Sequence, residues 1–226
     1  MLLGSNASQF LSGKHVAVFG IGGVGSYCAE ALARAGVGKL TLVDDDIVSV
    51  SNLNRQLIAL HSTVGMRKTE VMESRIHDIN PHCTVTALSR RYTPEDQNSF
   101  FAETYDYIAD CIDSVSCKTD LIYTALNKNI PIISAMGTGN KLDPQKLIVS
   151  DLAKTSGCPL ARVMRRELKK LGIIHHTVVY STESPLKPFF HPNDEIRVPG
   201  SVSWVPGSAG LMIAGKIILD LMNSDT

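Results

Sequence analysis

The sequence predicts an α/β fold of the Rossmann-like, doubly wound kind, with a mainly parallel sheet and a mixed C-terminal extension. Three observations predict this fold. Short apolar runs rich in β-branched residues alternate with helical patterns, a glycine-rich turn follows the first run, and 44% of the 226 residues are apolar. Alternating strands and helices favour a parallel sheet that helices cover on both faces. A chain of this length can bury one substantial core, so we expect a single domain over residues 1–226.

The regular alternation occupies the first 134 residues. We expect strands at residues 16–20, 39–43, 84–88, 107–111 and 130–134, where the apolar runs are short. Helical patterns between them predict helices at residues 25–35, 68–79, 94–101 and 116–128. Gly36 and Gly38 end the first of these helices, as glycines commonly do just past a helix.

The pattern becomes less regular after residue 134. A glycine loop at residues 135–140 precedes two more expected strands, at residues 147–151 and 178–181, which extend the same sheet. Between these strands, residues 160–171 form a strongly basic helical pattern. Residues 185–199 contain four prolines and are expected to form a surface loop. The last expected element, an apolar helix at residues 211–222, packs on the core or on a second subunit.

Composition and charge exclude several classes of protein. Lys and Arg number 22, as do Asp and Glu, so the net charge of zero gives no global attraction to nucleic acid. Any such binding then needs a local patch. No run approaches the roughly 18 apolar residues that span a membrane. The five cysteines form no CxxC pair, so we expect no disulfide scaffold, no structural zinc and a cytoplasmic protein.

The turn between the first expected strand and the first expected helix is rich in glycine. Its glycines are Gly20, Gly22, Gly23 and Gly25. Glycine lets backbone N–H groups approach an oxyanion closely, and the helix N-terminus adds unpaired N–H groups. Asp44 ends the second expected strand, where an acid can accept hydrogen bonds from ribose hydroxyls. These features predict a nucleotide site, and they suit NAD, FAD and ATP alike.

Polar and basic residues after the second strand favour ATP over a dinucleotide. The segment 51–56 supplies Asn52, Arg55 and Gln56, and Lys68 follows it. A hydride-transfer site does not need these residues beside the nucleotide. A triphosphate site does need them, because cations and polar groups offset the negative charge of the phosphates. Each cation alone would be an ordinary surface residue, but together, after an adenosine fingerprint, they predict a triphosphate site.

The order of these motifs resembles the E1-like adenylating superfamily, which includes the ThiF and MoeB types and the E1 enzymes of ubiquitin-like proteins. The resemblance covers roughly residues 16–134. It is carried by the glycine turn, Asp44-x-Asp46, the segment 51–56, Gly65-x-x-Lys68 and Asp110-x-x-Asp113. It implies a ThiF/E1-like fold in which residues 14–135 form the nucleotide-binding half and residues 136–226 a substrate and dimer half.

The resemblance also implies roles for individual residues. Gly23 lies behind the adenosine phosphates, Asp44 binds the ribose, and Asp113 holds Mg²⁺, which prefers carboxylate and phosphate oxygens. Arg55, Lys68 and Asp113 are the implied catalytic residues, and Arg55 can come from a partner subunit. A helix N-cap role competes for Asp113 and Ser114. The full set of implied nucleotide-binding residues is Gly20, Gly22, Gly23, Gly25, Asp44, Asp46, Asn52, Arg55, Gln56, Lys68, Asp113 and Ser114.

Further segments resemble one branch of the superfamily, the tRNA threonylcarbamoyladenosine dehydratases. They are residues 19–27, 151–155, 158–162, 180–183 and 200–206. This resemblance implies ATP-dependent cyclisation of N6-threonylcarbamoyladenosine in tRNA through an acyl-adenylate. It further implies a homodimer that uses ATP and Mg²⁺ without structural zinc or a membrane, and it allows a sulfur-transfer partner protein.

Three alternatives stay open. The first is adenylation of the C-terminus of a ubiquitin-like or sulfur-carrier protein, although enzymes of that kind generally keep two CxxC pairs for zinc. The second is a NAD-dependent oxidoreductase, against which Asn52, Arg55 and Lys68 argue, and the third is a non-catalytic nucleotide-binding module. Cys158 is the one cysteine placed for a thioester role. We expect it instead to be a small buried residue that caps nothing.

The basic helical pattern predicts a nucleic-acid surface. Its cations recur at spacings that place them on one helix face, and only Glu167 opposes them. A solvated face is the general expectation for such a run, but five cations are unusual in a neutral protein. We therefore expect this stripe to meet tRNA phosphates. Its members are Arg162, Arg165, Arg166, Lys169 and Lys170.

Overall fold

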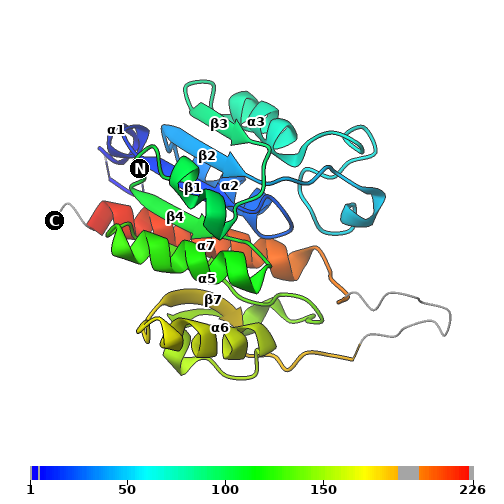
Figure 1. The fold of residues 1–226 in the computed structure, drawn as a ribbon. Helices are drawn as coiled ribbons and strands as arrows, with labels where there is room; N and C mark the ends of the chain where they lie inside the picture. Colours follow the sequence, from blue (N-terminus) through cyan, green and yellow to red (C-terminus); the bar gives the residue numbers. More distant parts are fainter. Residues whose placement is uncertain (1, 5, 188–198, 224–226) are drawn as a thin grey trace.

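One seven-stranded sheet runs through the computed structural model, which describes residues 2–4, 6–187 and 199–223 (Figure 1). The strand order is β3-β2-β1-β4-β5-β7-β6. All neighbours pair in parallel except β6, which is antiparallel to β7. The predicted α/β fold with a mixed C-terminal extension is therefore confirmed. The strands are β1 (His15–Phe19), β2 (Lys39–Val43), β3 (Thr84–Leu88), β4 (Tyr107–Asp110), β5 (Ile132–Ala135), β6 (Leu147–Asp151) and β7 (Thr177–Ser181).

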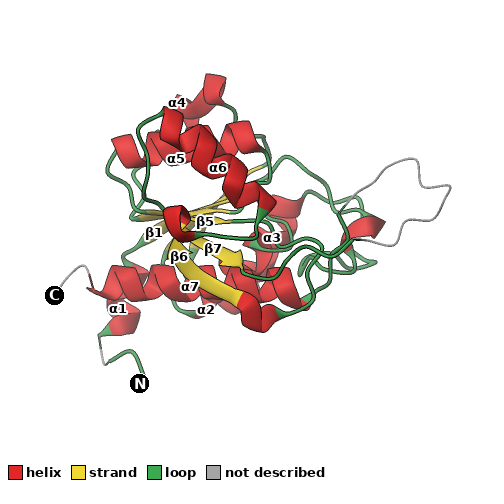
Figure 2. Cartoon of the chain, turned by 90° about the horizontal axis from the view of Figure 1, so that it is seen from below, coloured by secondary structure: helices red, strands yellow, loops and turns green. Residues whose placement is uncertain are grey.

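Helices cover both faces of the sheet (Figure 2). One face carries α1 (Ala7–Ser12), α2 (Gly25–Arg34), α3 (Lys68–Ile79) and α7 (Trp204–Asn223). The opposite face carries α4 (Gln97–Phe100), α5 (Val115–Asn127) and α6 (Pro159–Lys170). Single 3-10 turns complete the connections: η1 (Val50–Asn52), η2 (Pro94–Asp96), η3 (Pro144–Lys146) and η4 (Leu152–Lys154). Because each face has its own apolar cluster, every residue of β1 is buried.

The predicted bounds of most helices and strands lie within two residues of those in the structure. The larger differences have physical causes. Helix α7 begins at Trp204, so the prediction of a start at residue 211 is wrong. Its first turns contain Pro206, Gly207 and Gly210, residues that usually discourage a helix. They are needed here because a Cβ at Gly210 would lie 2.2 Å from the carbonyl oxygen of Val24 in the glycine turn. Helix α1 was not foreseen, and the helix expected at residues 94–101 is divided into η2 and α4.

Helix α7 is the element closest to a membrane span by composition. It has 20 residues and contains an 18-residue window with a mean hydropathy of 1.4, so its length and composition alone would allow it to cross a bilayer. However, Val205, Ala209, Ile213 and Ile217 are buried against α2 and the sheet. This four-residue spacing is the inner stripe of a core helix. The proline-containing segment expected to be a surface loop lies largely outside the described residues, since 188–198 are not described.

The sheet topology determines where a ligand can bind. Strand β1 pairs with β2 on one side and with β4 on the other. The direction in which successive strands are added to the sheet therefore reverses between β1 and β4. In open α/β sheets, ligands bind beyond the carboxyl ends of the strands at such a switch point. The residues that follow β1, β2, β4 and β5 therefore meet at one edge of the sheet.

Candidate active site

A cavity of about 630 Å³ lies at this edge, and the glycine turn contributes Gly20, Gly22 and Gly23 to its lining. Gly20 has a φ of +89°, a left-handed backbone that glycine adopts without strain. A Cβ at Gly20 would lie 2.7 Å from the carbonyl oxygen of Cys111. Gly25 lies behind the lining, and a Cβ there would lie 1.7 Å from the carbonyl oxygen of Gly20. The turn can pack this closely on the end of β4 only with glycine at both positions.

Asp44 connects the glycine turn to the end of β2. Its carboxylate accepts hydrogen bonds from the backbone N–H of Ile21 at 2.6 Å and of Asp46 at 2.9 Å. Burial, with a smaller contribution from the charge of Asp46, raises the pKa of Asp44 above its ordinary value, although Lys68 and these two donors act to lower it. Lys68 is itself buried, with its ammonium 2.6 Å from Asp46 and 3.8 Å from Asp44. The carboxylates of residues 44–46 lie within 4.8 Å of one another, but two of the three already have partners in the fold.

The loop after β2 brings Arg55 into the cavity of its own chain. Asn52 ends η1, and its side-chain oxygen accepts a bond from the N–H of Ser49, which stabilises the start of the loop. Arg55 then follows, with its Cγ 3.5 Å from the point where a Cβ on Gly23 would lie. Its Nη1 donates to the carbonyl of Ser51 at 2.8 Å. Arg55 therefore lines the cavity formed by its own chain.

Gln56 lies in the lining of the cavity and has one side-chain atom without a hydrogen-bond partner. The residue is 7% exposed and lines the cavity beside Gly22. In the described part of the chain, its Oε1 is the buried side-chain polar atom that has no hydrogen-bond partner. Such an atom costs free energy unless a ligand or water binds it.

Asp113 lies between β4 and α5, where its carboxylate faces the cavity and is exposed. Within the described residues it makes no hydrogen bond or ion pair. The N-cap position of α5 belongs to Ser114, whose side chain forms no capping bond and lies 3.3 Å from the hydroxyl of Ser116. Asp113 is therefore not used as a cap, and its carboxylate is available to a ligand.

The remainder of the lining was not predicted as site residues. Arg90, Arg91 and Tyr92 follow β3. The rule that carboxyl ends of parallel strands meet could have located them. The second half of the chain contributes a further surface that we call the far wall, which consists of residues 135–139, Leu160, Ser201 and Pro206. Pro206 also borders the glycine turn, since a Cβ on Gly23 would lie 3.4 Å from its Cβ. The sequence showed residues 135–140 as a glycine loop, but it gave no signal that Ser201 and Pro206 join them.

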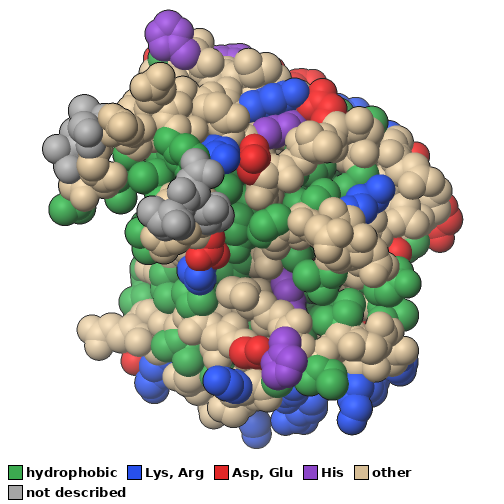
Figure 3. Space-filling model, turned by 90° about the vertical axis from the view of Figure 1, so that its left-hand side faces the viewer, with side chains coloured by type: hydrophobic (Ala, Val, Ile, Leu, Met, Phe, Trp, Pro, Cys, Tyr) green, Lys and Arg blue, Asp and Glu red, His purple; other side chains and the backbone are tan. Residues whose placement is uncertain are grey.

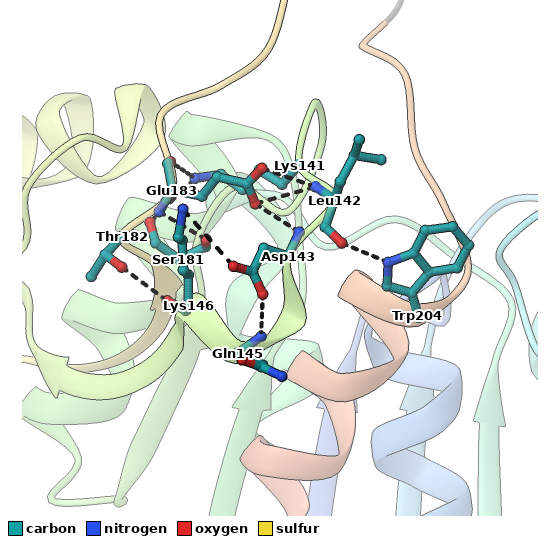
Figure 4. A network of polar contacts seen from close by, with 9 residues as sticks. All are labelled: Lys141, Leu142, Asp143, Gln145, Lys146, Ser181, Thr182, Glu183 and Trp204. Carbon is teal, nitrogen blue, oxygen red and sulfur yellow. Dashed lines mark hydrogen bonds and ion pairs between the residues drawn. The ribbon is translucent and has the colours of Figure 1, made fainter.

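The far wall is supported from behind by a polar network (Figure 4). The carboxylate of Glu183 accepts hydrogen bonds from the N–H groups of Leu142 and Asp143 at 3.0 to 3.2 Å. Lys141 is buried, and its ammonium donates to the backbone carbonyl of Glu183 at 2.6 Å. The indole N–H of Trp204 donates to the carbonyl of Leu142 at 2.7 Å. The turn behind the far wall is thus bonded to both the end of β7 and the start of α7.

A buried polar network lies beneath the cavity. Asp110 and Lys118 are both fully buried and form an ion pair of 2.7 Å. The hydroxyl of Ser134 donates to Asp110 at 2.6 Å and lies 2.7 Å from Nε2 of His176. Since the single hydroxyl proton is directed at Asp110, Nε2 of His176 must donate to Ser134. His176 is therefore a buried histidine whose Nε2 is already occupied by a hydrogen bond within the fold.

Protonation of His176 should weaken the fold. Burial, and secondarily Lys118, lowers the pKa of His176 from 6.5 to about 3. The unfolded chain binds this proton more readily, so the stability is fully present above pH 6.5 and is lost as pH falls toward 3. We expect the free energy of unfolding to fall by about 2 kcal/mol from this group between pH 7.5 and pH 5. In urea titrations, His176→Gln should remove this component; an unchanged pH dependence would contradict it.

The basic stripe lies on α6, and Figure 3 shows Lys and Arg side chains along the lower edge where Figure 1 places this helix. Arg162, Arg166 and Lys169 are exposed. Arg165 is not a free member of the stripe, because its guanidinium turns inward and donates to the carbonyl of Thr155 at 2.8 Å. The helical spacing predicted that Arg165 lies on the exposed face with the other cations. The structure differs because the turn at Thr155 accepts its hydrogen bond.

Cys158 is buried, as expected, but the expectation that it caps nothing is wrong. It is the N-cap residue of α6, and its sulfur accepts the backbone N–H of Ala161 at 3.5 Å. It lies behind the far wall, 3.6 Å from the point where a Cβ on Gly137 would lie. The sulfur therefore has a structural role that its position in the sequence did not reveal.

A family model, described as the ThiF family, matches residues 1–224. The chain belongs to the ThiF family. Over 98% of its length it is 42% identical to the tRNA threonylcarbamoyladenosine dehydratase of Bacillus subtilis, of which it covers 92%. Its ThiF-family fold matches crystal structures of the Escherichia coli tRNA N6-threonylcarbamoyladenosine dehydratase with AMP and with ATP, at TM-scores of 0.91 and 0.90. Both matches have 38% identity and cover 99% of this chain and 92% of that chain.

Similarity to a second kind of ThiF-family enzyme covers less of the chain. The molybdopterin-synthase adenylyltransferase of Salmonella typhimurium is 40% identical, but over only 56% of this chain and 50% of that protein. The likeness to the dehydratases therefore extends over the segments that form both walls of the cavity, whereas the likeness to the adenylyltransferase does not extend over the whole chain.

Proposed function

We propose that this protein is an ATP-dependent tRNA threonylcarbamoyladenosine dehydratase, which closes a ring on the modified adenosine through an acyl-adenylate. The observation that carries the proposal is one cavity whose lining brings together the glycine turn, Asp44 at the end of β2, the cations Arg55 and Lys68, and the far wall. The near full-length similarity to the dehydratases supports the choice of substrate. In this scheme residues 14–135 bind the nucleotide, and residues 136–226 form the substrate and dimer half.

ATP fits the nucleotide side of the cavity. The turn of Gly20, Gly22, Gly23 and Gly25 allows close approach of phosphate, and Asp44 lies where it can accept ribose hydroxyls, with Asp46 beside it. Asn52, Arg55 and Lys68 would contact the triphosphate. Gln56 lines the same cavity beside Gly22. Ser114 adds a hydroxyl at the same rim.

Mg²⁺ fits Asp113, whose carboxylate is exposed in the cavity and has no partner in the described part of the chain. Mg²⁺ is usually bound by one or two carboxylates together with phosphate oxygens and water. When bound, the ion would neutralise phosphate charge. Arg55 and Lys68 would act on the same charge directly, and their contribution is largest where negative charge develops.

The reaction needs activation because a carboxylate is a poor electrophile and hydroxide is a poor leaving group. Attack of the threonine carboxylate on the α-phosphorus of ATP forms the acyl-adenylate and releases pyrophosphate. A nitrogen of the same side chain then attacks the acyl carbon, loses its proton and expels AMP. The net change is the loss of water from the substrate. Since ring closure is intramolecular, positioning by the far wall can supply much of the rate without a protein nucleophile.

The tRNA substrate would dock on the exposed cations of α6. Arg162 and Lys169 are exposed and have no ion-pair partner among the described residues, whereas Arg166 pairs with Glu167. We expect Arg162→Glu with Lys169→Glu to weaken tRNA binding about tenfold and to reduce the salt slope by about two. Reversing Arg34 and Lys128, exposed cations outside α6, serves as the control. Equal tRNA affinity in both double variants would remove α6 from the interface.

A homodimer would cover the exposed face of α7. Leu211 and Leu219 are 54% and 52% exposed, and a Cβ on Gly215 between them would meet nothing within 4 Å. An apolar stripe of this kind is typical of a protein interface. A monomer in sedimentation equilibrium at micromolar concentration would contradict the dimer.

We also place the protein in the cytoplasm, where tRNA is modified and where its five free thiols stay reduced. A sulfur-transfer partner stays a prediction.

ATP–pyrophosphate exchange tests the function directly. The assay is run with tRNA that carries threonylcarbamoyladenosine, with a small sulfur-carrier protein, and with neither. We expect exchange, and loss of water from the nucleoside by mass spectrometry, only with the modified tRNA. Exchange only with the carrier protein would establish the first alternative, adenylation of a protein C-terminus, and hydride transfer with NAD would establish the oxidoreductase. Absence of any exchange would leave a non-catalytic binding module.

A further inference from the structure

The far wall is anchored on both sides of Ser201. Before it, the N–H of Gly200 donates to the side-chain oxygen of Asn140, and the N–H of Asn140 donates to the carbonyl of Gly200, both at 2.7 Å. After it, Trp204 donates to Leu142 in the same turn (Figure 4). The carbonyl of Ser201 is therefore a fixed point on the substrate side of the cavity.

Asn54 connects this fixed point to the phosphate side. Its Nδ2 donates to the carbonyl of Ser201 at 2.9 Å. Its Oδ1 accepts a hydrogen bond from Nη1 of Arg55 at 3.0 Å. The exposed side-chain amide of Asn54 thus bonds both to its neighbour Arg55 and to Ser201, which lies 147 positions away in the sequence. The amide nitrogen makes the bond to Ser201 and the amide oxygen makes the bond to Arg55.

Arg55 depends on few contacts for its orientation. Within the described residues it forms no ion pair, and its guanidinium donates to the carbonyl of Ser51 and to Asn54. A long arginine side chain has many rotamers, and each lost contact increases its freedom. Without Asn54, the guanidinium would keep only the bond to the carbonyl of Ser51. The loop would also lose its side-chain bond to the far wall.

We propose that Asn54 is a positioning residue that couples Arg55 to the far wall, so that the phosphate-contacting cation and the substrate surface keep one relative geometry. The proposal rests on the proposed role of Arg55 at the triphosphate. Asn54 itself is absent from the cavity lining and need not touch either substrate. Its effect should therefore appear in the rate of adenylate formation and little in the KM for ATP.

The test measures ATP–pyrophosphate exchange and KM for ATP in full-length variants with modified tRNA. Asn54→Ala should lower kcat about tenfold and leave KM for ATP within about twofold. Asn98→Ala, at an exposed asparagine of α4, is the matched control and should behave as the parent protein. A thermal melt of each variant reports whether the fold is intact.

Two double variants separate coupling from a general structural effect. In an Arg55→Ala background, Asn54→Ala should cause no further loss, because residues that act through one another are not additive. Asn140→Gly removes the side-chain acceptor of Gly200, and glycine tolerates the φ of +59° at this position. It should lower kcat in the parent protein and have less effect when Asn54 is already alanine.

The outcomes distinguish the inference from the function on which it rests. If Arg55→Ala keeps near-normal exchange, the proposed triphosphate contact is wrong. If Arg55→Ala abolishes exchange but Asn54→Ala retains the parent kcat, only the positioning role is overturned. Independent losses in the two Asn54 double variants would likewise overturn the coupling.

Discussion

Arg55→Ala should lower ATP–pyrophosphate exchange by at least about 100-fold while leaving the thermal melt unchanged. Arg55 lines the cavity beside Gly23, and its guanidinium takes part in no ion pair among the described residues, so its removal leaves no buried charge unpaired. Loss of a donor aimed at developing phosphate charge typically costs two to three orders of magnitude, as a rough guide. The measurement is exchange at saturating modified tRNA.

The control for this prediction is Arg34→Ala. Arg34 is an exposed arginine on α2 that pairs with Glu30 and does not line the cavity. It should leave exchange within about twofold, because exposed ion pairs contribute little. If Arg34→Ala and Arg55→Ala reduced exchange equally, the loss would reflect general damage, and Arg55 would have no special place at the triphosphate.

Lys118→Met should be the most destabilising single change considered, with a cost of about 3 to 5 kcal/mol in the free energy of unfolding. Lys118 and Asp110 are both fully buried, and the ammonium lies 2.7 Å from the carboxylate. Methionine has a similar length but no charge, so Asp110 would stay buried with only the hydroxyl of Ser134 and the N–H of Ile112 as donors. Urea unfolding at pH 7.5 measures the effect.

The matched control adds Asp110→Asn to Lys118→Met. The double variant has no uncompensated buried charge, so it should be more stable than Lys118→Met alone by about 1 to 3 kcal/mol. If the double variant were less stable by the sum of both single losses, the two residues would not be coupled. A loss of less than about 1 kcal/mol for Lys118→Met would contradict the importance of the pair.

Local patterns were sufficient for the sheet and for the nucleotide side of the cavity. The conformation of the glycine turn is determined within a few residues. Asp44 directly follows β2 and Asp113 comes three residues after the end of β4, so sequence spacing alone indicated where they would lie. These features depend on backbone geometry and on the period of the strands, which a single sequence displays.

The remaining features depend on partners far away in the sequence. Helix α7 starts early because glycines at positions 207 and 210 are required against α2, which no local propensity reports. Arg165 does not point outward with the basic stripe, because its guanidinium donates a hydrogen bond to the carbonyl of Thr155. Asn54 is a further example. The sequence motif identified its neighbour Arg55, but it could not indicate the hydrogen bond from Asn54 to the distant Ser201.

The composition of the cavity from distant segments has a consequence for synthesis of the protein. The glycine turn leaves the ribosome early, whereas 186 positions separate Gly20 from Pro206 on the far wall. At about 5 to 20 residues per second, this interval corresponds to roughly 10 to 40 seconds of translation. The glycine turn is therefore synthesised well before the residues of α7 that complete the lining of the cavity. The cavity is complete only once α7, which carries Pro206, has packed onto α2.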